Sequence, residues 1–181
     1  MKVTFPTRCL ILMLISVNTL LAQEAKDGPV IKGFGAVYDI PEADFATDTD
    51  KVFKVVFDVK GTAKKEGDIN KELNTAARFL NMHARAGVPV ENLHVALVVH
   101  NKAAKDLLTS KEYKSRYGVA NVNEPLLEAL LQAGVDIIFC GQSSHARNLP
   151  KAELVPGVQV SLSAMTALIQ LQDEGYRLIK F

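Results

Sequence analysis

The sequence is poor in cysteine, tryptophan and net charge, and each shortage excludes a class of protein. It has 181 residues, with two cysteines and no tryptophan. Two cysteines cannot build a disulfide framework, and no Cys and His cluster has the spacing of a zinc site. With 21 Lys and Arg against 20 Asp and Glu, the formal charge of +1 predicts no basic surface for nucleic acid. The 48% of hydrophobic residues is too high for a disordered chain, and the length suits one domain.

Long hydrophobic runs are scarce as well, and the longest lies at the N-terminus. Lys2 and Arg8 come before an apolar run over 9–21, and Ala22 then offers a small residue for cleavage. This run is short for a membrane span, and no later segment approaches the length that a bilayer requires. We therefore expect residues 1–22 to be a secretory signal peptide, which makes the protein exported, into a periplasm. The alternative is an uncleaved N-terminal anchor.

Cleavage would leave one cysteine in the mature chain. Loss of Lys2 and Arg8 changes the formal charge from +1 to −1, and loss of Cys9 leaves Cys140 alone. An unpaired thiol in an oxidising compartment must be buried, paired between chains or chemically occupied. The position of Cys140 in the fold therefore decides what chemistry the protein can perform.

Residues 23–50 show no helical period. Gly and Pro recur through this stretch, and an acidic cluster closes it. We expect an extended N-terminal arm that packs on the domain or on a neighbouring subunit, because the stretch holds more apolar residues than a free linker needs. A mobile tether is the alternative.

Residues 51–181 alternate between strand and helix patterns. Apolar runs predict five strands, and periodic apolar positions predict helices between them. The expected strands are 52–59, 93–99, 135–139, 158–162 and 176–181, and the expected helices are 68–86, 103–108, 124–133 and 163–174. Asn123 is the expected N-cap of the third helix, and the charged stretch between the second and third helices is expected to form a loop. Strands that are apolar throughout predict a mainly parallel five-stranded sheet covered on both faces.

In open sheets of this kind, ligands bind beyond the carboxyl ends of the strands. The polar residues and glycines at those ends are therefore candidate site residues. They are Lys60, Gly61, His100, Asn101, Cys140, Gly141, Gln142, Ser143, Ser144, Ser161 and Ser163. The rule collects the single mature thiol and a histidine on one edge.

Cys140 is the candidate reactive group of this edge. It ends a strand and comes before a short helix or turn, whose free N–H groups favour thiolate over thiol. Gly141 allows a ligand or a loop backbone to approach the sulfur closely. His100, His145 and Arg147 can add positive charge. The alternative is a small hydrophobe at the end of a buried strand, and His100 can equally be a hydrogen-bonded structural residue.

Three segments resemble the DsrE/DsrF-like family of sulfur-relay proteins. The most specific is GVDIIFCG at 134–141, followed by QSSHAR at 142–147. The others are LHVALVVHNKAAKDLL at 93–108 and LVPGVQVSLSAMTALIQLQDEGYRLI at 154–179. The resemblance covers about 51–181, most of the mature chain.

The resemblance implies a three-layer α/β/α sandwich, usually assembled into homo-oligomers such as trimers or hexamers. It also implies that Cys140 matches the cysteine that carries sulfur as a persulfide, and that His100 matches a residue near it. This chain departs from the sulfur relays of the family in its expected export, because those relays work in the cytoplasm with partner subunits.

Two main hypotheses follow for the function. In the first, Cys140 takes sulfane sulfur from a small sulfur species and passes it to a thiol, such as a partner thiol protein, with no metal or organic cofactor. Gln142, Ser143 and Ser144 would stabilise the anionic sulfur, and His100 would orient it or hold its proton. In the second, the chain is an oligomeric protein that binds a small ligand and keeps Cys140 inert. A redox sensor that forms an intersubunit disulfide is the third option.

Overall fold

Runs of β-branched and aromatic residues form the strands of one parallel sheet. The computed structural model describes residues 24–180. The strands are β1 (Phe53–Val59), β2 (Leu93–Val99), β3 (Asp136–Cys140), β4 (Gln159–Ser161) and β5 (Arg177–Ile179), in the order β4-β3-β2-β1-β5. Every neighbouring pair is parallel, which confirms the predicted five-stranded sheet.

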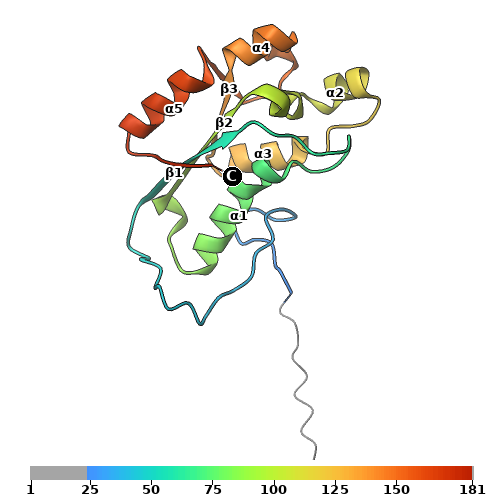
Figure 1. The fold of residues 1–181 in the computed structure, drawn as a ribbon. Helices are drawn as coiled ribbons and strands as arrows, with labels where there is room; N and C mark the ends of the chain where they lie inside the picture. Colours follow the sequence, from blue (N-terminus) through green and yellow to red (C-terminus); the bar gives the residue numbers. More distant parts are fainter. Residues whose placement is uncertain (1–23, 181) are drawn as a thin grey trace, which may run out of the picture.

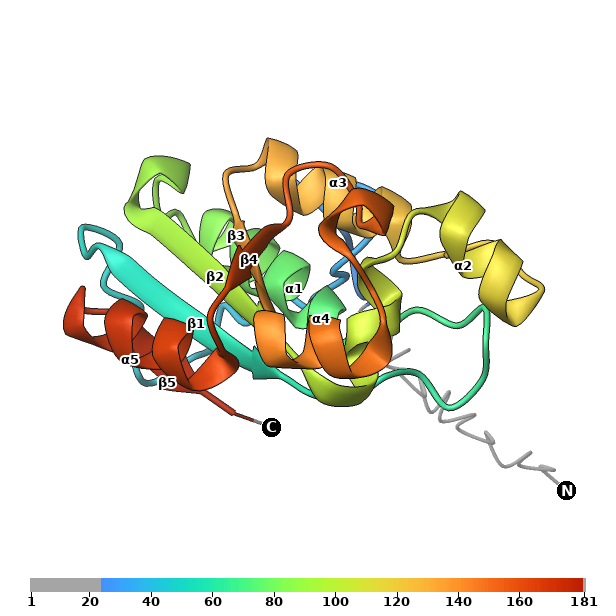
Figure 2. The same cartoon turned by 90° about the horizontal axis from the view of Figure 1, so that it is seen from above.

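Helices lie on both sides of the sheet, as the α/β/α prediction requires. Figure 1 shows α1 (Lys71–Arg85) and α3 (Glu124–Gln132) on one side, and α4 (Gly141–Arg147) and α5 (Ala164–Asp173) on the other. The view from above in Figure 2 shows α2 (Ser110–Tyr117) beyond the end of the sheet. Three short 3₁₀ helices complete the fold: η1 (Val90–Asn92), η2 (Asn101–Leu107) and η3 (Lys151–Glu153).

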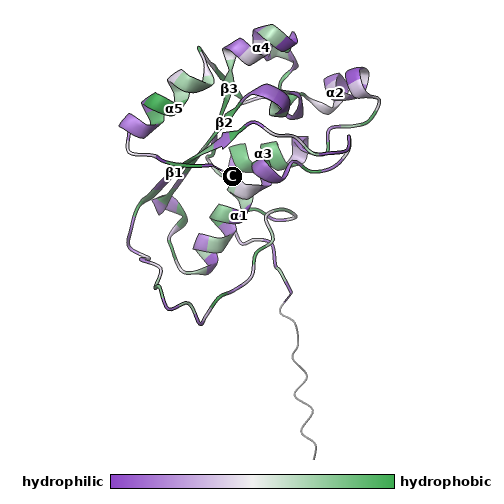
Figure 3. Cartoon of the chain, viewed as in Figure 1, coloured by the Kyte–Doolittle hydropathy of each residue, from purple (hydrophilic) through white to green (hydrophobic). Residues whose placement is uncertain are grey.

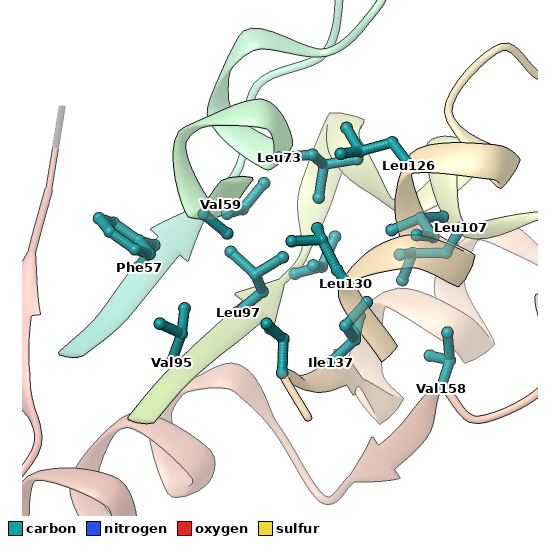
Figure 4. Close-up of a cluster of buried hydrophobic side chains, with 14 of the residues drawn as sticks. Phe57, Val59, Leu73, Val95, Leu97, Leu107, Leu126, Leu130, Ile137 and Val158 are labelled. Carbon is teal, nitrogen blue, oxygen red and sulfur yellow. The ribbon is translucent and has the colours of Figure 1, made fainter. Parts of the chain in front are cut away.

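The larger core lies between the sheet and the pair α1 and α3. Alternate residues of β1 and β2, such as Phe57 and Leu97, meet Leu73 of α1 and Leu130 of α3 in this layer (Figure 4). Burial of each such side chain contributes about 1.5–3 kcal/mol to stability before its loss of entropy is subtracted. This core holds the strands in register, so it also fixes where their carboxyl ends lie.

The core on the other side of the sheet is smaller. It contains Val56, Val98 and Cys140 from the strands, and Ala167 and Leu171 from α5. Residues 56, 98 and 140 therefore share the face of the sheet that α5 covers. Apolar residues, green in Figure 3, recur along α5, and two of them, Met165 and Ile169, are exposed.

The stretch that the sequence suggested was a loop forms a helix for most of its length. Thr109 caps α2 by accepting a hydrogen bond from the N–H of Glu112, and Gly118 ends the helix with a left-handed φ of 82°. Tyr113 of α2 is buried, and its hydroxyl donates a hydrogen bond to Glu66. The expected helix over 103–108 is the 3₁₀ helix η2 instead.

Asn123 occupies the predicted N-cap position of α3, but it does not cap the helix with its side chain. Its backbone is helical, and its side chain makes no capping hydrogen bond. The amide oxygen instead accepts from the N–H of Asn70 at 2.7 Å, and the amide nitrogen donates to Asn121 at 3.2 Å. The Asn123 side chain thus binds the distant Asn70 and not the N–H groups in the first turn of α3.

The N-terminal segment crosses α1, and one buried side chain holds it there. Asn81 of α1 accepts from the N–H of Ile31 at 2.8 Å and donates to the carbonyls of Ile31, Phe34 and Gly35. Ile31 is buried in the larger core. The expected signal peptide, 1–22, lies outside the described residues. Within residues 24–180, no helix has the length and apolar character needed to cross a membrane.

Candidate functional site

The site lies at the carboxyl edge of the sheet, where β3 runs directly into α4. Cys140 is the last residue of β3, and Gly141 is the first residue of α4. Cys140 pairs in register with Ser161 of β4, so the loop from β4 to α5 begins beside it. Two helix N-termini, those of α4 and α5, therefore meet next to one sulfur.

Four hydrogen-bond donors surround the Cys140 sulfur. They are the backbone N–H groups of Gln142, Ser143 and Ala164 and the hydroxyl of Ser143. Burial raises the pKa of the Cys140 thiol, but these donors together outweigh burial and lower the pKa below its ordinary value. The first residues of a helix have N–H groups without a helical partner, so they donate to the sulfur without breaking a helix bond. The arrangement favours a thiolate.

Ser143 connects the sulfur to the end of β2. Its Oγ accepts a hydrogen bond from the backbone N–H of Asn101 at 3.1 Å. The oxygen of the Ser143 hydroxyl thus accepts from Asn101, while its hydrogen is donated to the sulfur of Cys140. Asn101 has a left-handed φ of 54°, which is uncommon outside glycine. The amide oxygen of Asn101 in turn accepts from Arg147 Nη2 at 2.8 Å, so the end of β2 is linked to both ends of α4.

Gly141 is required by a neighbouring backbone. A Cβ at this position would lie 2.5 Å from the carbonyl oxygen of Ser161 and 3.3 Å from that of Leu162. The sequence predicted that Gly141 lets either a ligand or a loop backbone come close. In the structure it is the backbone of the loop at Ser161 and Leu162 that does so. Gln142 strengthens the same contact, because its Nε2 donates to the Leu162 carbonyl at 3.3 Å. The tight contact keeps the Ala164 N–H against the sulfur.

Three predicted site residues use their polar groups away from the sulfur. The hydroxyl of Ser144 donates to the carbonyl of Leu149 at 2.8 Å, at the far end of α4. Ser163 caps α5 by accepting from the N–H of Thr166 at 3.0 Å. The side chain of Lys60 is exposed, and its backbone N–H donates to Glu72. Of the hydroxyls that the sequence suggested for the anionic sulfur, only that of Ser143 is directed to it.

His100 has a carboxylate partner that sequence reasoning missed. Its Nε2 lies 2.7 Å from Oδ1 of Asp58, and Nζ of Lys180 lies 3.1 Å from Oδ2 of the same carboxylate. The side chain of Asp58 is only 7% exposed. Burial opposes ionisation of Asp58, but hydrogen bonds from His100 and Lys180 outweigh burial and lower its pKa. Asp58 is the one acidic residue within the apolar strand FKVVFDV, and that break in the pattern was the available signal.

The end of β1 shows how a fixed anion is held at this edge. Glu72 Oε2 accepts from the backbone N–H groups of Lys60 and Gly61, each at 2.9 Å. A Cβ on Gly61 would collide with the same carboxylate. The free N–H groups at the end of β1 therefore bind a carboxylate of the protein itself, whereas those at the end of β3 face the sulfur of Cys140.

A buried polar cluster supports the loops behind the site. Asp106 of η2 accepts from Thr62 Oγ1 at 2.7 Å and from Asn70 Nδ2 at 2.7 Å. Burial raises the pKa of Asp106, although both hydrogen bonds act in the opposite direction. Asn121 donates to the carbonyl of Asp106 at 2.9 Å. These bonds fix η2, which begins at Asn101 beside the sulfur. Across residues 24–180, no three His, Cys, Asp or Glu side chains are grouped as metal ligands would be.

Comparisons with known proteins support the resemblance that the motifs carried. A family model, the DsrE/DsrF-like family, matches residues 51–181. The solved structure of the ychN protein from E. coli is similar, with a TM-score of 0.53 and 19% identity over 71% of this chain and 99% of that one. MTH1491 of Methanobacterium thermoautotrophicum, described as a protein of unknown function, gives a TM-score of 0.51 and 19% identity over the same shares. None of the curated proteins matches. At this identity the two structures establish the fold alone.

Proposed function

Because this chain belongs to the DsrE/DsrF-like family, we propose that it carries sulfane sulfur on Cys140 as a persulfide and passes it to a thiol. Family membership suggests a role related to sulfur relay. The assignment to Cys140 depends on one observation, the four donors around its sulfur, which lower the pKa of the thiol. A thiolate is the nucleophilic form of cysteine.

The first step is loading, the transfer of one sulfur atom from a donor to Cys140. The Cys140 thiolate attacks the terminal sulfur of a sulfane donor such as a polysulfide. A bond forms between the two sulfur atoms, the sulfur–sulfur bond of the donor breaks, and the shortened donor leaves with the electron pair. The donors that stabilise the thiolate, Ser143 and Ala164 among them, also stabilise negative charge on the persulfide. The reaction needs no oxidant and no cofactor.

Intact-mass spectrometry after incubation with polysulfide tests the proposal. We expect the chain from residue 23 onward, which lacks Cys9, to gain the mass of one or more sulfur atoms, which a reductant removes, and its Cys140→Ser variant to gain none. Peptide mapping should place the added sulfur on Cys140. An unchanged mass of the wild-type chain, when a control thiol in the same tube is modified, would overturn the proposal.

The second candidate is an oligomeric small-ligand-binding protein with an inert Cys140. One observation favours it, since Cys140 is only 5% exposed. The rate of alkylation by iodoacetamide separates the two candidates. A sulfur carrier should react at neutral pH faster than a free thiol such as glutathione, because more of its thiol is ionised. An inert cysteine should stay protected until the protein is denatured.

We also propose that the chain forms a homo-oligomer, a trimer or a hexamer, through the outer surface of α5. Leu162, Met165 and Ile169 are 72%, 73% and 59% exposed. Their spacing of three and four residues places them along one side of the helix and the loop before it. Large apolar side chains gathered on a surface are typical of protein interfaces.

Export is the remaining part of the proposal. We propose that residues 1–22 direct the protein to the periplasm and are removed. The support is the sequence pattern of two early cations, an apolar run over 9–21 and Ala22. Cell fractionation with mass measurement of the mature N-terminus tests it. A cytoplasmic protein that retains residues 1–22 would overturn it.

A further inference from the structure

A row of polar side chains crosses the carboxyl edge of the sheet on the side that α5 covers. Asp58 lies two residues after Val56 on β1, so both are on the face of the sheet that α5 covers. Cys140, the last residue of β3, is on the same face. His100 comes one residue after the pair Val99 and Phe139, which places it level with Cys140 on the next strand. Lys180 comes one residue after Ile179, the partner of Phe57, which places it level with Asp58. Neighbouring strands are about 4.8 Å apart.

Asp58 uses both carboxylate oxygens within this row. One accepts from His100 Nε2 at 2.7 Å, and the other pairs with Lys180 Nζ at 3.1 Å. When Nε2 carries the hydrogen that Asp58 accepts, the neutral imidazole keeps Nδ1 as its proton-accepting nitrogen.

Glu72 of α1 also lies at this edge, but its carboxylate accepts from the backbone N–H groups of Lys60 and Gly61, and α1 lies on the other side of the sheet (Figure 1). Lys102 of η2 and His145 of α4 are exposed, and Arg147 is held by Asn101. From α5, the residues that face the sheet are apolar, Ala164, Ala167 and Leu171. Asp58 is therefore the carboxylate that balances a positive charge on His100, with Lys180 as its second partner.

We propose that Asp58 is a positioning residue for sulfur transfer and that it orients His100 to take the proton of an incoming acceptor thiol. The inference rests on the proposed function of Cys140. The acceptor gives its proton to Nδ1 of His100, and the resulting thiolate attacks the outer sulfur of the Cys140 persulfide. The sulfur–sulfur bond breaks and its electron pair returns to Cys140, whose thiolate is stabilised by the four donors. The acceptor leaves as a persulfide, and His100 releases its proton to solvent.

The two half-reactions separate this role from a structural one. Loading from polysulfide involves no acceptor proton, whereas discharge to a thiol does. We expect Asp58→Asn to slow discharge to 2-mercaptoethanol about 10- to 100-fold near neutral pH, and to leave loading within about twofold. The difference in discharge should disappear as pH rises towards the pKa of the acceptor thiol, because solvent then supplies the thiolate. Discharge is followed by intact mass after excess polysulfide has been removed.

Two further variants keep the test decisive. His100→Gln should show the same loss of discharge and the same recovery at high pH, even if Asp58→Asn folds poorly. Asp136→Asn is the matched control, because this carboxylate binds Gln159 Nε2 at 3.1 Å at the opposite end of the strands. Normal loading with unchanged discharge in Asp58→Asn and His100→Gln would overturn the roles of Asp58 and His100 and leave the proposed function of Cys140 standing. Failure of the wild-type chain to load would overturn the proposed function instead.

Discussion

The Ser143 hydroxyl lies between the backbone N–H of Asn101, which donates to it at 3.1 Å, and the sulfur of Cys140, to which it donates. The Ser143 hydroxyl therefore links the first residue of η2, Asn101, to the sulfur of Cys140. It is also the one side-chain donor among the four groups that stabilise the thiolate.

Ser143→Ala should raise the pKa of Cys140, because the variant loses this donor and keeps the backbone N–H. A hydrogen bond to a charged group contributes about 1.5–3 kcal/mol, so alkylation near neutral pH should slow by about 10- to 150-fold. The measurement is the rate of iodoacetamide reaction against pH. Ser144→Ala is the matched control, since that hydroxyl binds the Leu149 carbonyl instead. Identical pH midpoints for Ser143→Ala and the wild type would contradict the prediction.

Gly141→Ala should destabilise the fold and disturb the sulfur together. The added Cβ would lie 2.5 Å from the Ser161 carbonyl oxygen, and backbone atoms must move to make room. Overpacking of this kind costs about 1–3 kcal/mol, measured by urea unfolding. The loop that shifts leads into Ala164, so the pKa of Cys140 should rise as well. Gln142→Ala, which loses only an exposed hydrogen bond, should change the unfolding free energy by less than about 0.5 kcal/mol. Equal stability of the two variants would count against the contact.

The sequence predicted the strands and the edge at which the site lies, because apolar runs form parallel strands and their carboxyl ends share one edge. It predicted Cys140 and Ser143 for the same reason. It did not reveal Asp58 or Lys180 as partners of His100, since that contact depends on the strand order, with β1 between β2 and β5. Ser144 was misassigned because residues 143 and 144 have the same chemistry, and only the direction of each side chain on α4 distinguishes them.

Met165→Glu should dissociate the proposed homo-oligomer. Met165 is 73% exposed on α5, and a carboxylate placed in an apolar interface must lose its water without gaining a partner. Size-exclusion chromatography with light scattering should show an oligomer for the wild type and a monomer for the variant. Met82→Glu is the matched control, because Met82 is 46% exposed on α1, on the other side of the sheet. A monomeric wild type, or an oligomer that survives Met165→Glu, would contradict the proposed surface.

The stability of the fold should depend on Asp58 in a way that acid removes. Burial opposes the ionisation of Asp58, but hydrogen bonds from His100 and Lys180 outweigh it, so the folded-state pKa lies below the ordinary 3.8. Ionised Asp58 therefore stabilises the fold above the unfolded-state pKa, and this contribution is lost as pH falls through the folded-state pKa. Asp106 acts in the opposite direction, because burial raises its pKa, so the pH dependence of the wild type alone mixes two effects.

The difference between the wild type and Asp58→Asn isolates the contribution of Asp58, because Asp106 is present in both. Near pH 7 the variant should be less stable by about 1.5–3 kcal/mol, the usual contribution of hydrogen bonds to a charged group. The gap should narrow steadily in urea unfolding experiments as pH is lowered from about 5, since the wild type then loses the charge that the variant never had. Asp173→Asn, at an exposed carboxylate on α5, should show no such gap at any pH. A gap that stays constant into acid would mean that Asp58 stabilises the fold through its shape and not through its charge.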